Sequence, residues 1–250
     1  MEKGNFILNL YPSTKFMLPL FVTISIFFVP GYLYAYLMLP LCILIAFFAG
    51  KAKELVNLVV KGLLVLVLFI FIIQSVIAPG EEIFWSWGII SIKQEGVMRS
   101  LSLTSKIIAI ASAFLLFFRI TPVKDISQAL ERIGMSPKFS YAIIATFQFI
   151  PEISNRSKVI MEAQKSRGVE TEGNLLTRAK AFIPVLGPLV LSSITSTEER
   201  AIALETRAFS AIGKKTSLNE LTKRRIDYII QVAMVILLTI LLIGRIWLWN

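Results

Sequence analysis

Residues 16–50 read FMLPLFVTISIFFVPGYLYAYLMLPLCILIAFFAG, a run of 35 residues without a charged side chain. A helix needs about 20 apolar residues to cross the hydrocarbon core of a bilayer, which is roughly 30 Å thick. Pro30-Gly31 interrupts the run near its middle, and both residues favour turns over helix. The stretch therefore predicts two short membrane spans, 16–29 and 32–49, joined by a tight turn.

Three further apolar stretches lie outward from this run. They cover residues 55–78, about 100–118 and 228–249, which gives about five spans. Lys61, Lys106 and Arg245 lie within these stretches. Each is close to the end of its span, so we expect its charge to reach the headgroup region along a flexible stem. The sequence predicts an all-α polytopic membrane protein.

The composition agrees with this fold class and excludes several functions. The chain of 250 residues is 56% hydrophobic and only 17% charged, whereas soluble domains are about a quarter charged. It contains no His and a single cysteine, Cys42. Thiolate metal clusters, internal disulfides and His-based catalysis are excluded. We therefore expect no cofactor, no metal and no catalytic residue in this chain.

The segment 83–92 is apolar but too short to cross a bilayer as a helix. It contains Trp85 and Trp87. Because Trp is enriched at the membrane–water interface, we expect an interfacial segment here.

Basic residues orient the spans. The short connection after the second predicted span contains Lys51 and Lys53, and residues 119–225 hold 17 Lys and Arg against 10 Asp and Glu. Cytoplasmic loops of membrane proteins carry an excess of Lys and Arg. We expect both regions and the N-terminus in the cytoplasm, with the C-terminus outside. The predicted organisation is a membrane part (1–118), a cytoplasmic region (119–225) and a last span (226–250).

The cytoplasmic region contains two similar blocks. Each begins with Phe-Ile-Pro, at residues 149–151 and 182–184, and continues as an amphipathic helical pattern. Each ends in an Arg flanked by small residues, in Ser166-Arg167-Gly168 and Thr206-Arg207-Ala208. Pro151 and Pro184 are candidates for hinges or for fixed helix entries, and we favour fixed entries.

Two roles are open for the arginines. A basic residue near a helix C-terminus commonly caps its own helix. A guanidinium between small residues is also accessible to a partner, and its planar fork suits a carboxylate or exposed carbonyls. Because the arrangement occurs twice, we favour docking of a partner on both helices.

At this point the sequence resembles the transmembrane T component of energy-coupling factor transporters, the CbiQ/EcfT family, over about residues 11–216. The stretches that carry the resemblance are YPSTK at 11–15, which is similar to a signature Asp/His-Pro-x-x-Lys except at Tyr11, SAFLL at 112–116 with Arg119 and Thr121, ALER at 129–132, FIP at 149–151 with EAQKSRG at 162–168, and Pro184 with ETRAF at 205–209.

The resemblance implies a non-catalytic membrane scaffold in an ATP-driven importer. It implies that Ser166-Arg167-Gly168 and Thr206-Arg207-Ala208 end two coupling helices that dock on two cytoplasmic ABC-type ATPase subunits. ATP and Mg would be bound by those subunits. A separate small membrane substrate-binding (S) component would carry a vitamin or a transition-metal ion.

A stand-alone secondary transporter, or a scaffold without ATPase partners, is the alternative. A secondary transporter needs polar or ionisable groups near the bilayer midplane. The predicted span centres offer only Thr23, Ser25, Gln74 and Ser112.

Residues 213–216 (GKKT) lack the glycine spacing and residue order of a phosphate-binding loop. No nucleic-acid-binding module is recognisable, so we expect no nucleic acid partner. The basic residues between 214 and 225 favour contact with anionic lipid of the bilayer.

Overall fold

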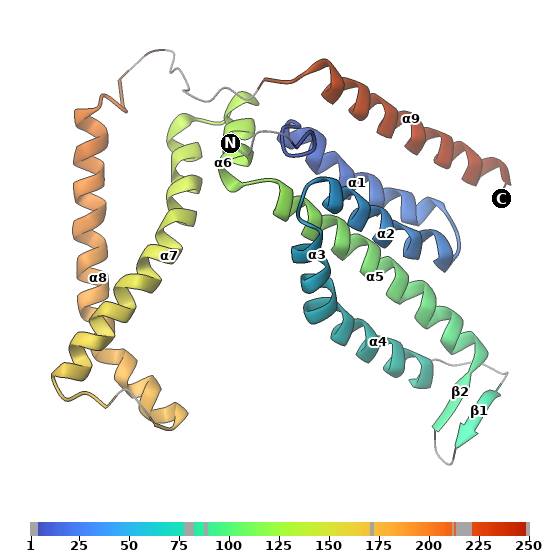
Figure 1. The fold of residues 1–250 in the computed structure, drawn as a ribbon, viewed down its shortest axis with the longest axis horizontal. Helices are drawn as coiled ribbons and strands as arrows, with labels where there is room; N and C mark the ends of the chain where they lie inside the picture. The colour runs from blue at the N-terminus through green and yellow to red at the C-terminus, as the bar shows by residue number, and fades with distance from the viewer. Residues whose placement is uncertain are drawn as a thin grey trace. The chain divides into compact units, whose positions relative to one another are not determined.

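A computed structural model describes residues 5–77, 83–87, 90–170, 173–211, 213 and 222–248. Its elements in chain order are α1 (Pro12–Phe28), α2 (Tyr32–Phe48), α3 (Ala52–Leu58), the π-helical turn η1 (Val59–Leu63), α4 (Leu64–Ile77), β1 (Ile83–Trp87), β2 (Ile90–Lys93), α5 (Gln94–Ile120), α6 (Val123–Arg132), α7 (Pro137–Ser166), α8 (Leu175–Thr206) and α9 (Arg225–Leu248) (Figure 1). The described residues are helical apart from the antiparallel pair β1–β2 and the connections, which confirms the all-α fold class.

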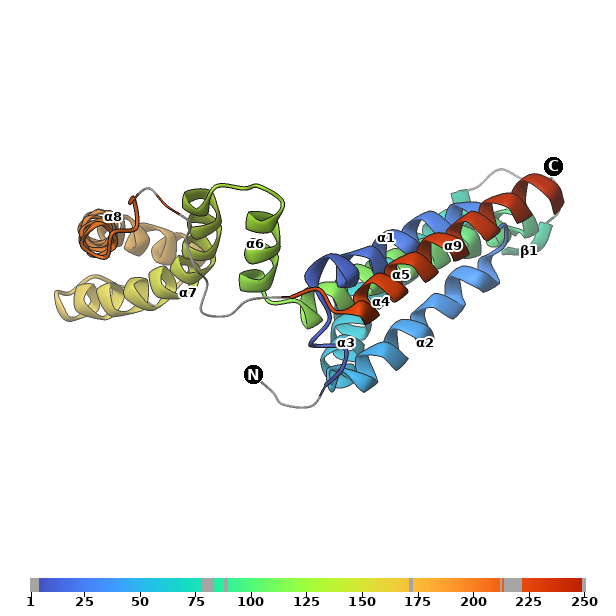
Figure 2. The same cartoon turned by 90° about the horizontal axis from the view of Figure 1, so that it is seen from above.

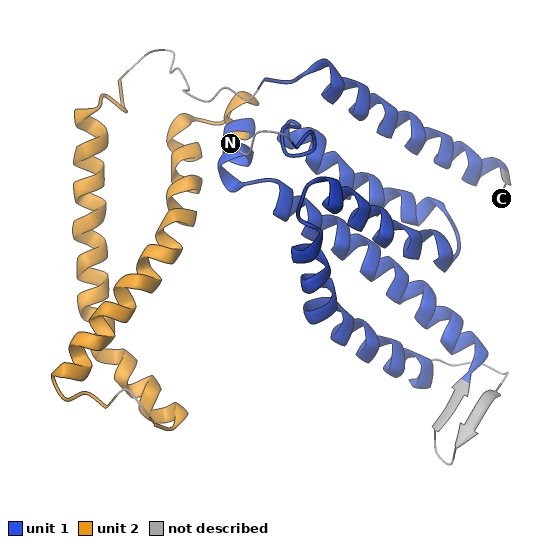
Figure 3. Ribbon diagram, viewed as in Figure 1, with its two compact units in different colours: residues 1–129, 221–250 blue, residues 130–220 orange. Residues whose placement is uncertain are grey.

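The chain forms two compact units (Figure 3). Unit 1 comprises residues 1–129 and 221–250, and unit 2 comprises residues 130–220. The chain leaves unit 1 within α6 and returns to it just before α9.

Helix α5 is the centre of unit 1. It packs against α1, α2 and α4, and α9 packs against α1 (Figures 1 and 2). The buried residues where α2 and α5 meet recur every three or four positions and are small apart from Met38: Ala35, Met38, Cys42 and Ala46 on α2, and Ala109 and Ala113 on α5. Small residues allow helix backbones to approach closely, which is the usual basis of helix association in a membrane.

The predicted membrane helices are present, with boundaries a few residues longer or shorter than expected. The third expected span is continuous from Ala52 to Ile77 and contains the π-helical turn with Lys61 and Gly62. Within the described residues, four helices are long and apolar enough to cross a membrane: Ala52–Ile77, Gln94–Ile120, Leu175–Thr206 and Arg225–Trp247. Helices α1 and α2 are apolar but have 17 residues each, as expected for short spans.

Length and hydropathy thus place α8 among the candidate spans, whereas its sequence pattern predicts a coupling helix outside the membrane. The segment predicted as interfacial forms the strands β1 and β2 around Trp85 and Trp87.

Two of the charges within the spans make contacts that the sequence did not predict. The Lys106 ammonium lies 5.8 Å from the centre of the Phe27 ring. Arg245 donates hydrogen bonds to the carbonyls of Phe27 and Phe28 at the end of α1. Arg245 therefore does more than extend toward headgroups, because it caps a neighbouring helix.

Candidate functional site: two arginine caps on an antiparallel helix pair

Helices α7 and α8 form the antiparallel pair of unit 2. The Tyr141 and Phe209 rings are 5.4 Å apart, so the start of α7 lies beside the end of α8. Near the other end, the Gln164 side chain donates to the Pro184 carbonyl at 3.4 Å. Sequence positions therefore rise along one helix as they fall along the other.

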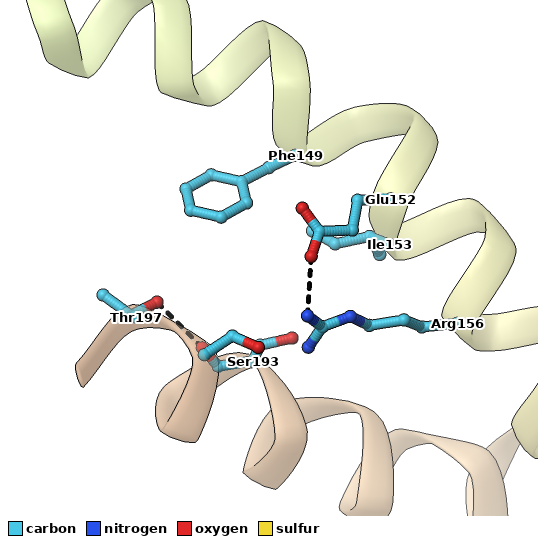
Figure 4. Close-up of a pocket in the computed structure, with 7 residues that line it drawn as sticks. Phe149, Glu152, Ile153, Arg156, Ser193 and Thr197 are labelled. Atoms are coloured by element: carbon cyan, nitrogen blue, oxygen red, sulfur yellow. Dashed lines mark hydrogen bonds and ion pairs between the residues drawn. The ribbon is translucent and has the colours of Figure 1, made fainter. Parts of the chain in front are cut away.

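A charged cluster joins the two helices at the middle of the pair, and Figure 4 shows its Glu152–Arg156 ion pair on α7. Glu152 of α7 accepts a hydrogen bond from Arg156 one turn away, at 2.6 Å, and another from Arg200 of α8. Arg156 also donates to the Ser192 carbonyl of α8 at 3.0 Å. The Arg200 guanidinium lies 4.4 Å from the centre of the Phe149 ring, where a cation is attracted to the face of the ring. One carboxylate thus binds both helices.

Beside this cluster is a pocket of about 160 Å³ lined by Phe149, Glu152, Ile153, Arg156, Ser193, Ser196 and Thr197 (Figure 4). The Thr197 hydroxyl donates to the Ser193 carbonyl within α8. We assign the pocket no ligand, because its charged groups are already paired with each other.

The ion cluster predicts a pH dependence. The hydrogen bond from Arg200, reinforced by the charges of Arg200 and Arg156, holds the pKa of Glu152 below its ordinary value of 4.5. A lowered carboxyl pKa stabilises the folded pair above the ordinary pKa and loses this contribution as pH falls through the lowered one. We expect Glu152→Gln to destabilise the protein near neutral pH, and the difference from the parent to vanish well below pH 4.5. Thermal unfolding of both proteins across this pH range measures it.

Glu199→Gln is the matched control, since Glu199 is exposed on α8 and has no ion pair among the described residues. Its difference from the parent should stay small at every pH. A Glu152→Gln effect that persisted undiminished in acid would contradict the role of the ionised carboxylate.

Helix α7 ends in a Schellman cap built around Arg167. The Val169 N–H donates to the Gln164 carbonyl at 3.1 Å, and the Gly168 N–H donates to the Lys165 carbonyl at 3.0 Å. These two hydrogen bonds define the motif, which needs a left-handed residue after the C-cap. Gly168 supplies it with φ of +87°.

Helix α8 ends in the same cap around Arg207. The Phe209 N–H donates to the Leu204 carbonyl at 3.0 Å, and the Ala208 N–H donates to the Glu205 carbonyl at 2.9 Å. Here Ala208 takes the left-handed position with φ of +59°. The duplicated sequence therefore forms a duplicated backbone structure. The second motif has Ala208 where the first has Gly168, and both make the same cap hydrogen bonds.

Both arginines are free to meet a partner. All six residues of the two motifs, Ser166 to Gly168 and Thr206 to Ala208, are exposed. Neither guanidinium makes a hydrogen bond or ion pair with another residue in the part of the chain that the structure describes. The backbone caps each helix, so these side chains are not needed as caps.

The two caps lie at opposite ends of the pair (Figure 1). Gln164, just before Arg167, contacts Pro184, and Arg207 lies further along α8 by about 35 Å at 1.5 Å per residue. Arg167 and Arg207 are therefore placed to contact two separate partner surfaces and not a single one.

The prediction that Pro151 and Pro184 mark helix entries is wrong. Both lie inside helices. Helix α7 begins at Pro137 because Ser136 accepts the Phe139 N–H at 3.3 Å, and α8 begins after Asn174, which accepts the Leu175 N–H at 2.8 Å. These N-caps are earlier start signals.

Internal prolines remove a helical hydrogen bond and bend the helix. Figure 1 shows α8 changing direction along its length.

The left-handed positions give a matched pair of substitutions. A Cβ at Gly168 would meet no atom within 4 Å, so Gly168→Ala adds only the strain of the backbone, about 1 kcal/mol. Ala208→Gly should remove the same strain. We expect the melting temperature to fall by roughly 3 °C for the first and to rise by a similar amount for the second. Thermal unfolding of the purified variants checks this, and a fall for Ala208→Gly would contradict the cap.

Three of the four polar residues expected at the span centres make hydrogen bonds within their own helices. The hydroxyls of Thr23, Ser25 and Ser112 each donate to a carbonyl of their own helix. Among the described residues, no group of three or more His, Cys, Asp or Glu could hold a metal ion.

The chain is similar to known transport proteins. The family model described as CbiQ, cobalt transport protein, matches residues 4–218. The chain is 32% identical to the energy-coupling factor transporter transmembrane protein EcfT of Ruminiclostridium cellulolyticum, over 91% of this chain and 88% of the relative. It is 30% identical to the protein of the same name from Staphylococcus aureus, over 96% and 92% of the two chains.

Proposed function

The chain belongs to the CbiQ family of cobalt transport proteins, and we propose that, as the transmembrane component of an energy-coupling factor transporter, it passes motion from ATPase subunits to a substrate-binding membrane subunit. The observation that carries this proposal is the identical capping of α7 and α8, which leaves Arg167 and Arg207 exposed at opposite ends of one helix pair.

We propose that each arginine cap docks on one of two cytoplasmic ABC-type ATPase subunits. A guanidinium can bind a carboxylate or several helix-end carbonyls through its planar fork. The flanking Ser166, Gly168, Thr206 and Ala208 have small side chains that let a partner backbone approach. Two sites at opposite ends of the pair, separated by about 35 Å of helix, suit two copies of similar subunits better than one.

The chain itself performs no catalysis in this proposal. ATP and Mg bind the ATPase subunits, and closure of these subunits moves α7 and α8. Because Glu152 ties the two helices together through Arg156 and Arg200, the pair responds as one body, and rigid-body movement is a recognised form of conformational switching. The contacts at the caps must differ between the two ATPase states for ATP to drive the change.

The exposed apolar faces of α7 and α8 supply a surface for the small substrate-binding subunit. They include Phe147, Ile150, Ile183, Val190 and Leu191. The solute would be a vitamin or a transition-metal ion bound by that subunit. In this arrangement unit 2 and the N-terminus are cytoplasmic, and the C-terminus is outside.

Purification of the tagged chain from native membranes in mild detergent, followed by mass spectrometry, tests the proposal. Recovery of two nucleotide-binding subunits and a small, hydrophobic membrane protein would support it, and the identity of that protein would name the solute. Recovery of a stable chain alone across several mild detergents would overturn it and favour a stand-alone transporter.

A further inference from the structure

The buried side chain of Lys15 holds the end of α5. It is only 3% exposed, and its Nζ donates to the carbonyls of Leu8 at 2.9 Å and Ile120 at 3.0 Å. Ile120 is the last residue of α5, where a positive charge is favourable because the last carbonyls of a helix lack partners. The neighbouring Thr121 hydroxyl is buried without a hydrogen-bond partner in the described part of the chain, so it does not cap α5 in place of Lys15.

The carboxylate of Asp227 holds the start of α9. It is 1% exposed and accepts the Arg224 N–H at 2.8 Å, which caps its own helix. Its other oxygen accepts the Tyr11 N–H at 2.9 Å. Tyr11 is the N-cap of α1 and has no side-chain hydrogen bond of its own for capping. One carboxylate thus caps two helices that are more than 200 positions apart in the sequence.

These contacts meet at residues 11–15. The ammonium of Lys15 is attracted by Asp125, in the first turn of α6, and by Asp227. Ile120 precedes the chain segment that leaves unit 1, and Arg224 follows the segment that returns to it. The start of α1 therefore contacts the unit 1 end of both connections to unit 2.

We propose that Lys15 and Asp227 are positioning residues that clamp the outgoing and returning chain connections to α1, so that movement of unit 2 reaches the membrane helices at one fixed junction. This inference rests on the coupling function proposed above. Without the clamp, each connection can shift independently. Movement of α7 and α8 then displaces the connections and does not reach the membrane helices.

The first measurement needs only the purified chain. Spin labels at Lys124→Cys and Thr222→Cys, both exposed, flank the two connections within unit 1. Cys42 is fully buried and stays in place. Pulsed electron paramagnetic resonance measures the distance between the two labels. The distance distribution should be narrow in the parent and at least about twice as wide with Lys15→Met or Asp227→Asn. The amide of Asp227→Asn can accept only one of the two N–H bonds.

Gln231→Ala is the matched control. The Gln231 side chain donates to Ser13 at 3.1 Å and Thr14 at 3.0 Å in the same junction but touches neither connection. Its distance distribution should match the parent. Equal broadening in all three variants would show a merely structural junction and overturn the clamp, and no broadening in Lys15→Met or Asp227→Asn would also overturn it. If Lys15→Met does not fold, Asp227→Asn, which keeps the side-chain size, decides the question.

The second measurement uses the complex with its ATPase subunits. A label pair at Lys53→Cys in unit 1 and Glu198→Cys in unit 2 reports movement when MgATP and vanadate are added. We expect the parent to show a shift, and the clamp variants to hydrolyse ATP within about twofold of the parent with most of the shift lost. A full shift in the clamp variants would overturn the inference. If no ATPase subunit copurifies with the parent, the coupling function fails, while the first label pair still tests the clamp.

Discussion

Replacing Arg167 and Arg207 together with Glu is expected to remove the ATPase subunits from the complex recovered with the tagged chain. Both side chains are exposed and make no hydrogen bond or ion pair with other described residues, so their loss should leave the fold intact. Arginines at the centre of an interface commonly contribute about 2 kcal/mol or more each. Since 1.4 kcal/mol is tenfold in affinity, the double substitution should reduce binding by about a hundredfold or more.

The control carries the same change in charge elsewhere on unit 2. Arg178→Glu with Lys180→Glu alters two exposed residues on the first turns of α8, outside both arginine motifs. Quantitative mass spectrometry of the copurified subunits should show near-parental recovery for this control. Lysine at positions 167 and 207 should give an intermediate result, because an ammonium cannot reproduce the planar fork. Parental recovery with both glutamates would remove these arginines from the docking site.

The membrane helices could be predicted from the sequence because their signal is local. Residues 32–49 were predicted as a span and α2 covers Tyr32–Phe48, and the span predicted at about 228–249 is α9, Arg225–Leu248. An unbroken apolar run must be buried or in lipid, and helix is the conformation that satisfies its backbone within one segment.

The prediction for Pro151 and Pro184 was wrong because a proline commonly marks the first turn of a helix, whereas these helices begin at capping residues further upstream. Pro151 and Pro184 read as helix starts, yet Ser136 and Asn174 provide capping side chains many residues earlier. The packing of α7 on α8 then stabilises the helices across the missing hydrogen bonds. The six residues expected to dock a partner lie at two equivalent helix ends, but the backbone conformation of these ends was not foreseen. The residue after each Arg adopts a left-handed backbone conformation, which Gly168 accommodates freely and Ala208 only with strain.

The junction at residues 11–15 could not be predicted from one sequence. The bond from the Tyr11 N–H to Asp227 joins positions 216 apart, and a single acidic residue at the start of a helix reads as an ordinary capping group. The position of Lys15 before an apolar run likewise favours an exposed charge at the membrane surface. Only the packing of α1 between α5 and α9 brings Lys15 to the end of α5.

Enlarging Ala113 to Leu is expected to have the largest effect on stability. Ala113 has no exposed surface and belongs to the cluster where the small residues of α5 meet those of α2. The added branched side chain has no space unless the helices separate, and such overpacking costs about 3 kcal/mol at the upper end of its usual range. For a chain of this length that corresponds to a fall in melting temperature of roughly 10 °C, measurable by thermal unfolding of the purified protein.

Ala233→Leu makes the same chemical change on an exposed face of α9. A leucine there faces lipid, so its melting temperature should stay within about 2 °C of the parent. The contrast separates close packing of α2 on α5 from a general sensitivity of membrane helices to bulk. Equal melting temperatures for both variants would mean that the α2–α5 contact can open at little cost. In that case α5 could not carry movement from the Lys15 junction into the membrane unit, because α2 would separate from α5 before moving with it.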